Sequence, residues 1–172
     1  RQFNQERRVP DMDSFLIINP YGIGDVLFST PVISSLKAHN PHSTIYYLCN
    51  RRTAELLKDH PDIDGIFIYD RDDFARVKVV SFWQWIKKWA ALIRQIREKK
   101  IRAALDFSIN TGIGAIPMLA GISRRAGLNF KRRGKFLTDS IVINGFEDKH
   151  VAEYYLDALA LLKIPRAEAG LS

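Results

Sequence analysis

The chain has 172 residues, enough for one domain of ordinary size but not for two. It is 47% hydrophobic, yet no apolar run approaches the ~18 residues of a membrane span, and its single cysteine, Cys49, excludes an internal disulfide. The 26 Lys and Arg residues against 19 Asp and Glu give a net charge of +7, which favours anionic partners such as phosphates, nucleic acid or acidic lipid.

Segments typical of strands and helices alternate along the chain. The predicted strands are residues 15–19, 44–48, 65–69, 102–107 and 125–128, with a weaker one at 140–143. Helical patterns fall at 25–39, 53–59, 82–100, 112–120 and 151–163. This alternation predicts an α/β fold, a single doubly wound Rossmann-like domain with a mostly parallel sheet.

The domain is expected at residues 15–164, after an N-terminal extension at 1–14. Residues 165–172 are expected to form a tail or the start of an interdomain linker. Because the chain begins at Arg1 rather than Met, we expect it to be a piece of a longer protein. No signal peptide precedes the first strand, so a cytoplasmic location is expected.

Two glycine turns follow the first and the fourth predicted strand. In the common strand order 3-2-1-4-5 these strands are neighbours where the winding reverses, and ligands bind at their carboxyl ends. Glycine permits a positive φ and lets backbone approach a ligand closely. The candidate ligand-binding residues are Tyr21, Gly22, Gly24, Ser108, Asn110, Thr111 and Gly112. The candidate catalytic residue is the carboxylate Asp25.

Other function classes fit the residues less well. The first turn matches the dinucleotide fingerprint only in part, because Leu27 stands where a third glycine or alanine is required. Arg51 and Arg52 suit a 2′-phosphate, so an NADP-binding Rossmann domain stays open as an alternative, as does a non-catalytic sugar-phosphate binding module. The histidines lack metal-ligand spacing, so no metal is expected. The basic clusters lack a recognition helix or an RNA-binding signature, so no nucleic-acid partner is expected.

Several segments carry a more specific pattern. They are INPYGIGDVLFSTPVISSLKAHNP at 18–41, RRTAELL at 51–57, HPDID at 60–64, LDFSINTGIGA at 105–115, SRRAGL at 123–128 and HVAEYYL at 150–156. Together they resemble the amino-terminal half of the lipopolysaccharide heptosyltransferases, which are family 9 glycosyltransferases. The likeness covers nearly the whole chain and is strongest over residues 15–70.

This resemblance implies one half of a GT-B glycosyltransferase, the half that faces the acceptor. ADP-heptose, the donor, is then expected to bind a carboxyl-terminal donor-binding domain, and no cofactor is expected. Enzymes of this family transfer heptose with inversion of configuration and need no metal for catalysis. The acidic residue of their Gly-Asp motif, here Asp25, is the implied general base. The implied partner is an anionic glycolipid acceptor, and the implied setting is lipopolysaccharide synthesis at the inner face of the inner membrane.

Structural roles compete with these functional ones. Asp25 suits a helix cap as well as a catalytic base. Asp106 is expected to brace the second turn by accepting backbone N–H bonds. Ser108, Asn110 and Thr111 suit either a sugar or phosphate ligand or a turn without a ligand.

The segment at 82–100 predicts an amphipathic helix with basic flanks. Its apolar face contains Phe82, Trp85, Ile86, Trp89, Leu92, Ile93 and Ile96. We expect this face to pack on the sheet as a crossover helix does. A basic helix that bears tryptophan also suits peripheral contact with an anionic membrane, and Trp83, which lies off the packed face, is the better candidate for that contact.

Overall fold

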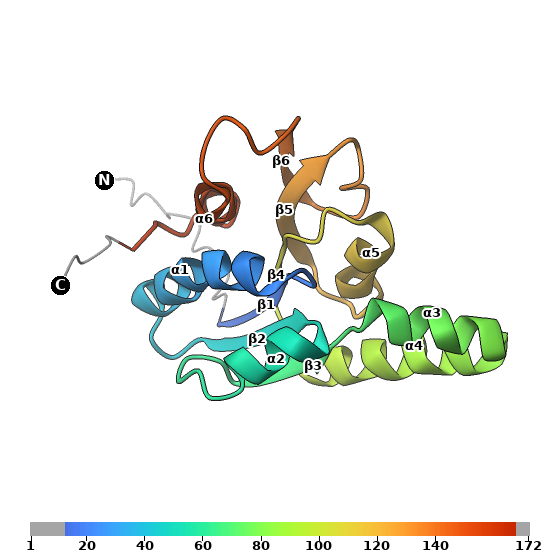
Figure 1. Ribbon diagram of the computed structural model, residues 1–172. Helices are drawn as coiled ribbons and strands as arrows, with labels where there is room; N and C mark the ends of the chain where they lie inside the picture. Colours follow the sequence, from blue (N-terminus) through green and yellow to red (C-terminus); the bar gives the residue numbers. More distant parts are fainter. Residues whose placement is uncertain (1–12, 168–172) are drawn as a thin grey trace, which may run out of the picture.

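The computed structural model describes residues 13–167 (Figure 1). Most of the expected extension at 1–14 and of the expected tail at 165–172 therefore lies outside the described residues. The strands are β1 Ser14–Ile18, β2 Thr44–Cys49, β3 Gly65–Ile68, β4 Ala103–Asp106, β5 Arg124–Phe130 and β6 Asp139–Ile143. The helices are α1 Ile23–His39, α2 Arg51–Leu57, α3 Arg71–Val80, α4 Phe82–Glu98, α5 Thr111–Leu119 and α6 Val151–Leu161.

All six strands form one parallel sheet in the order β3-β2-β1-β4-β5-β6. The predicted α/β class and strand order are confirmed, and the weak sixth strand takes the edge beside β5. The segment that connects β5 to β6, residues 131–138, contains no helix, whereas parallel strands are usually joined by a longer crossover with a helix. Lys131 and Arg132 turn the chain there with positive φ values of 49° and 59°.

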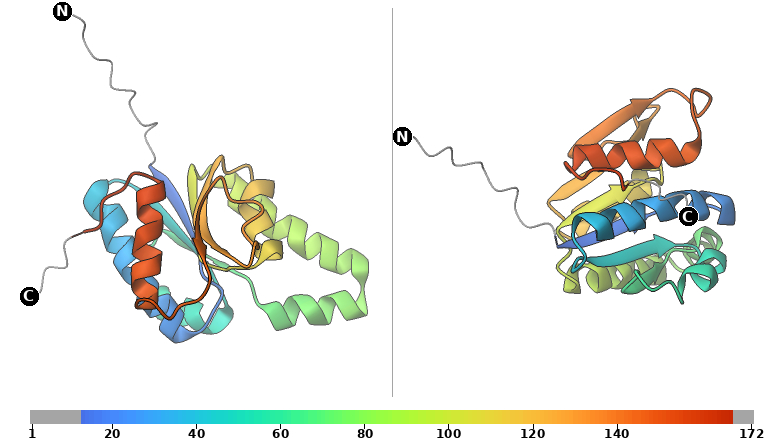
Figure 2. Two further views of the ribbon diagram at one scale, coloured as in Figure 1. Left: turned by 90° about the horizontal axis from the view of Figure 1, so that it is seen from above. Right: turned by 90° about the vertical axis from the view of Figure 1, so that its left-hand side faces the viewer.

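Helices cover both faces of the sheet, as Figures 1 and 2 show. Successive residues of a strand point to opposite faces. In β1, Phe15 and Ile17 therefore belong to the core beneath α1, α2 and α6, while Leu16 and Ile18 belong to the core beneath α4 and α5. Because β1 is buried on both faces, its sequence reads as a continuous apolar run.

One helix, α3, was not predicted from the sequence. Its sequence, RDDFARVKVV, buries a single side chain, Phe74, and contains three valines, which have low helix propensity. The helix is capped by Asp70, whose carboxylate accepts the N–H groups of Asp72 and Asp73. Packing of Phe74 against Trp89 of α4, with ring centroids 4.7 Å apart, stabilises it. Tertiary contact thus outweighs a weak local pattern.

The long amphipathic helix α4 packs on the sheet over only part of its length. Leu92 and Ile96 are buried, whereas Phe82 and Ile86, which were expected on the packed face, are exposed. The expectation of a packed face along the whole helix is therefore wrong at these two positions, whereas Trp85 packs against the core as expected. The first two turns of α4 pair with α3 in a helical hairpin that projects from the body of the domain (Figure 2). Trp83 is exposed, as predicted.

Candidate functional site

A pocket of about 280 Å³ opens where the carboxyl ends of β1 and β4 meet. It is lined by Tyr21, Asp25, Phe107, Ile109, Phe146, Val151 and Tyr155. These side chains come from the β1–α1 turn, the start of α1, the segment after β4, the β6–α6 connection and α6. In open parallel sheets ligands bind at this edge, beside the point where the strand order reverses. The pocket is therefore the candidate site.

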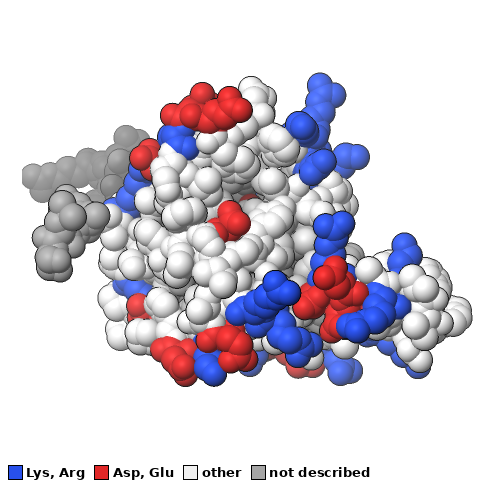
Figure 3. Space-filling model, viewed as in Figure 1, with Lys and Arg blue, Asp and Glu red and all other residues white. Residues whose placement is uncertain are grey.

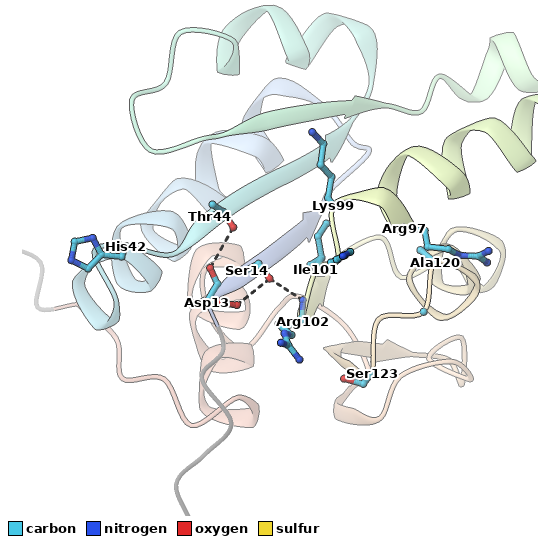
Figure 4. Close-up of a pocket in the computed structure, with 12 residues that line it drawn as sticks. Asp13, Ser14, His42, Thr44, Arg97, Lys99, Ile101, Arg102, Ala120 and Ser123 are labelled. Atoms are coloured by element: carbon cyan, nitrogen blue, oxygen red, sulfur yellow. Dashed lines mark hydrogen bonds between the residues drawn. The ribbon is translucent and has the colours of Figure 1, made fainter.

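A larger cavity, of about 740 Å³, lies at the opposite edge of the sheet (Figure 4). It surrounds the start of β1 and includes the basic side chains of Arg97, Lys99 and Arg102. This edge carries the amino ends of the parallel strands, away from the turns that bind ligands in such folds. Size alone therefore does not select the functional pocket.

Asp25 is half-buried at the third position of α1. The N-cap of α1 is Gly22, so the alternative that Asp25 merely caps the helix is wrong. The Asp25 carboxylate lines the pocket instead, and its Oδ1 atom accepts a hydrogen bond of 3.5 Å from the hydroxyl of Tyr155. Unpaired N–H groups in the first helical turn favour a negative charge at this position. The pocket thus contains a carboxylate that is available as a proton acceptor.

Tyr155 and Asn19 hold Asp25 in place. The Tyr155 ring stacks on Phe107, with ring centroids 4.3 Å apart. Burial, together with the charge of Asp25, raises the pKa of Tyr155, so the phenol keeps its proton and donates it to the carboxylate in a hydrogen bond. From the other side, the buried amide of Asn19 donates to the Asp25 backbone carbonyl at 3.0 Å. Both contacts reduce the freedom of the Asp25 side chain and backbone.

The two glycine turns touch each other, as the strand order predicts. The Tyr21 hydroxyl, in the first turn, donates to the backbone carbonyl of Ser108 in the second. Burial is the main reason that the pKa of Tyr21 is raised, so this donor also stays protonated. The Asn50 amide donates to the carbonyl of Tyr21 at 2.6 Å while its oxygen accepts from Thr53 at the start of α2. The first turn is therefore anchored to both neighbouring strands.

The polar side chains of the second turn serve the turn itself. Asn110 caps α5, because its Oδ1 atom accepts the N–H groups of Gly112 and Ile113. Thr111 donates to the carbonyl of Arg133, and Ser108 is fully buried. None of these side chains lines the pocket described above. Of the alternatives that the sequence left open for them, the structure supports that of turn formers.

The glycines of these turns do not adopt the expected positive φ. Gly22 has a φ of −73°, and Gly121 is the glycine with positive φ among residues 13–167. The left-handed position in the second turn is Ile109, with φ of 42°, an unusual conformation for a β-branched residue. A side chain at Gly22 or Gly24 would meet no protein atom closer than 4.0 Å. A side chain at either position would therefore meet open space rather than a packed neighbour.

No protein-family model matches the chain. A curated relative, lipopolysaccharide heptosyltransferase 3 of Escherichia coli, is 37% identical to it over 65 residues, which are 37% of this chain and 19% of the relative. The resemblance to the heptosyltransferases is confirmed.

Solved structures of two heptosyltransferases and of a family 9 glycosyl transferase share the fold of this heptosyltransferase-like chain. The E. coli ADP-heptose lipopolysaccharide heptosyltransferase II matches with a TM-score of 0.68 and 22% identity over 90% of this chain. A glycosyl transferase of family 9 from Veillonella parvula matches with a TM-score of 0.72 and 19% identity over 94% of this chain. E. coli heptosyltransferase WaaC with ADP-2-deoxy-2-fluoro heptose matches with a TM-score of 0.76 and 14% identity over 91% of this chain. The chain covers 41%, 44% and 50% of these three proteins, respectively.

Residues 13–167 contain neither a cluster of metal ligands nor a helix that could span a membrane. Among these residues, no three His, Cys, Asp or Glu side chains are grouped as metal ligands. No helix in the same range has both the length and the apolar character needed to cross a membrane.

Asp106 braces the second turn, as predicted. It is the last residue of β4 and is buried, and its Oδ1 atom accepts the N–H of Ser108 at 2.8 Å. A side chain at Gly114 would come within 3.0 Å of the other carboxylate oxygen, so this glycine leaves room for the carboxyl group. Burial raises the pKa of Asp106 to about 6, although the hydrogen bonds with Ser108 oppose the shift.

Asp106→Asn should change how stability depends on pH. The pKa of Asp106 is about 6 in the folded protein and near ~3.9 in an unfolded chain, so ionisation costs the folded state free energy as pH rises from 4 to 7. This difference between the folded and the unfolded pKa corresponds to a loss of about 2 kcal/mol in the free energy of unfolding between pH 4 and pH 7. Asparagine keeps the acceptor for Ser108 but does not ionise, so this loss should disappear.

Urea denaturation at pH 4 and pH 7 measures the effect. The matched control is Asp72→Asn, which removes an exposed carboxylate in the first turn of α3. It should keep the pH dependence of the parent chain. An identical pH dependence in the parent chain and in Asp106→Asn would contradict the buried ionisation.

Sequence reasoning identified Asp25 and Tyr21 of the pocket but missed its other walls. Phe107, Ile109 and Phe146 are single apolar residues between polar residues or glycine, and no motif marks them. The sequence predicts Tyr155 only as part of the helix at 151–163. The one available signal was its position in the last helix of the fold, because that helix packs beside α1 and so meets the start of that helix.

Proposed function

We propose that this chain is the acceptor-side half of an inverting glycosyltransferase that transfers a heptose from ADP-heptose to a lipopolysaccharide-type acceptor. The observation that carries the proposal is Asp25, whose carboxylate lines the pocket at the reversal of strand order and does not cap its helix. The 37% identity to lipopolysaccharide heptosyltransferase 3 supports the same activity class. The WaaC structure that matches this chain holds an ADP-heptose analogue, which supports ADP-heptose as the donor.

Asp25 acts as the general base in this reaction. An acceptor hydroxyl in the pocket donates its proton to the Asp25 carboxylate while the hydroxyl oxygen forms a bond to the anomeric carbon of the donor. The bond between that carbon and the diphosphate breaks on the opposite face, and ADP leaves with the electron pair. Tyr155 directs the carboxylate through its hydrogen bond, and the apolar walls, Phe107 and Phe146, exclude water from the reacting atoms.

The pocket by itself lacks groups for the leaving diphosphate. None of the side chains that line it is Lys or Arg. Electrostatic stabilisation of the charge that develops on the leaving group is usually the largest catalytic contribution. We therefore assign the diphosphate-binding groups to a second, donor-binding domain, in keeping with a chain that covers half or less of each of the three solved proteins.

The 172-residue chain alone should catalyse no detectable transfer. Without the donor-binding domain it lacks both the charge stabilisation and the positioning of the donor, and positioning can contribute about 7 kcal/mol or more. The test measures acceptor-dependent ADP release from ADP-heptose by the chain alone and by the chain joined to a donor-binding domain. Only the joined protein should release ADP.

Two outcomes would contradict the proposal. Acceptor-dependent ADP release by the chain alone would place the whole active site within these residues. Absence of transfer by a folded joined protein, over a panel of lipopolysaccharide-type acceptors, would reject heptosyl transfer. Saturable binding of NADPH to the chain would instead favour the dinucleotide-binding alternative.

A further inference from the structure

Helices α3 and α4 form an antiparallel hairpin at one end of the molecule. A single residue, Ser81, ends α3 and caps α4, so the turn between the helices is tight. The hairpin projects beyond the sheet in two views (Figures 1 and 2). Phe74 is the buried residue of α3, while the buried residues of α4, Leu92 and Ile96, belong to its second half. The end of the hairpin therefore contributes little to the core.

This end, which we call the hairpin tip (residues 78–87), exposes large apolar side chains. Val79 is 88% exposed, Val80 74%, Phe82 55% and Trp83 72%. Phe82 stacks on Trp85, with ring centroids 5.7 Å apart, so the aromatic rings form one cluster. Scattered apolar residues are common on protein surfaces, but a contiguous cluster at a projecting turn marks an interaction site.

The charged residues of the tip itself are all basic. Residues 74–97 contain six basic residues and no Asp or Glu. The six are Arg76, Lys78, Lys87, Lys88, Arg94 and Arg97. Within the described residues, Lys78 and Lys87 make no ion pair, whereas Arg76 and Lys88 pair with Asp73 and Arg94 pairs with Glu98. In Figure 3 the end of the hairpin is a white surface with blue groups beside it. The partner must therefore accept apolar side chains and carry negative charge.

We propose that the hairpin tip inserts into the headgroup region of an anionic lipid bilayer. Tryptophan favours this region because its ring is apolar and its N–H is polar. Lysines beside an apolar cluster bind anionic headgroups while their stems cover apolar surface. A bilayer also accommodates a projecting tip without a complementary groove, which a protein partner would have to supply. The contact is peripheral and independent of the transfer reaction.

Sedimentation with lipid vesicles tests the inference on the 172-residue chain. Vesicles of phosphatidylglycerol and phosphatidylethanolamine should bind the chain, and vesicles of phosphatidylcholine should bind it weakly. The pair Val80→Ser and Trp83→Ser should lower the vesicle affinity about tenfold or more, because the tip then has less apolar surface to bury. Binding should also weaken as salt shortens the Debye length from about 10 Å at 0.1 M to about 3 Å at 1 M.

The matched control is Val142→Ser, which removes a side chain that is 72% exposed on β6, outside the hairpin. It should bind vesicles as the parent chain does. A second readout is fluorescence, because acyl chains with bromine quench tryptophan that enters the bilayer, and Trp83→Phe should remove much of that quenching. No binding to the acidic vesicles at low salt, or equal loss in the tip and Val142 variants, would overturn the inference. So would unaltered binding by the paired tip variant.

Discussion

Asp25→Asn is expected to lower heptosyl transfer by about 10²-fold or more in a protein that joins this chain to a donor-binding domain. Asparagine keeps the size of the side chain and still accepts a hydrogen bond from Tyr155, but it does not take up the proton of the acceptor hydroxyl. The loss should therefore fall on kcat, since the interaction with the moving proton exists only in the transition state.

The fold should hardly change in this variant. Because Gly22 is the N-cap of α1, replacing Asp25 costs only its interaction with the helix dipole, about 1 kcal/mol or less. Asp72→Asn again serves as the matched control, since it removes an acid from the first turn of another helix, away from the pocket. Near-normal turnover in Asp25→Asn, with the control also active, would rule out Asp25 as the general base.

Gly127→Ala should destabilise the domain by about 3 kcal/mol, at the upper end of the usual cost of overpacking. Gly127 lies in β5 directly beside Asp106 of β4. A Cβ atom at this glycine would overlap the carbonyl oxygen of Asp106, and it would lie within 3.2 Å of the Asp106 Cβ atom. Backbone in the centre of a parallel sheet has no room to move aside, so β4 and β5 must separate.

Urea denaturation of the 172-residue chain measures this loss, and Gly145→Ala is the matched control. A methyl group at Gly145 would have no neighbouring atom within 4 Å, and the residue has no positive φ, so alanine should be nearly neutral there. Equal stability of the two variants would mean that β4 and β5 do not approach as closely as described. Asp106 also accepts the N–H of Ser108 in the second turn. If Gly127→Ala weakens acceptor binding as well, we infer that the displaced Asp106 has altered the conformation of that turn.

The arrangement of the sheet could be predicted from the sequence to a large extent. The apolar runs of β1 and β4 are long enough to be buried on both faces, and each ends in a turn with glycine. Parallel strands linked by helices wind in one hand, so the two turns had to meet at one edge. The contact between Tyr21 and Ser108 confirms that they do.

Other features depend on contacts that local patterns do not report. The helix α3 exists because Phe74 packs on α4, and its valines alone would argue against a helix. The apolar face of α4 has a regular helical period, but periodicity does not show how much of that face reaches the sheet. Only the three-dimensional arrangement separates the buried Leu92 from the exposed Phe82.

The sequence by itself determined the α/β class, the strand order and the acid at the start of α1, because hydrophobic periodicity and turn residues act over short distances along the chain. The tertiary structure alone decided what surrounds that acid. Tyr155 lies 130 positions from Asp25, and it reaches the carboxylate only because α6 packs beside α1. Side chains distant in sequence become neighbours through packing of the core, and no local pattern encodes that packing.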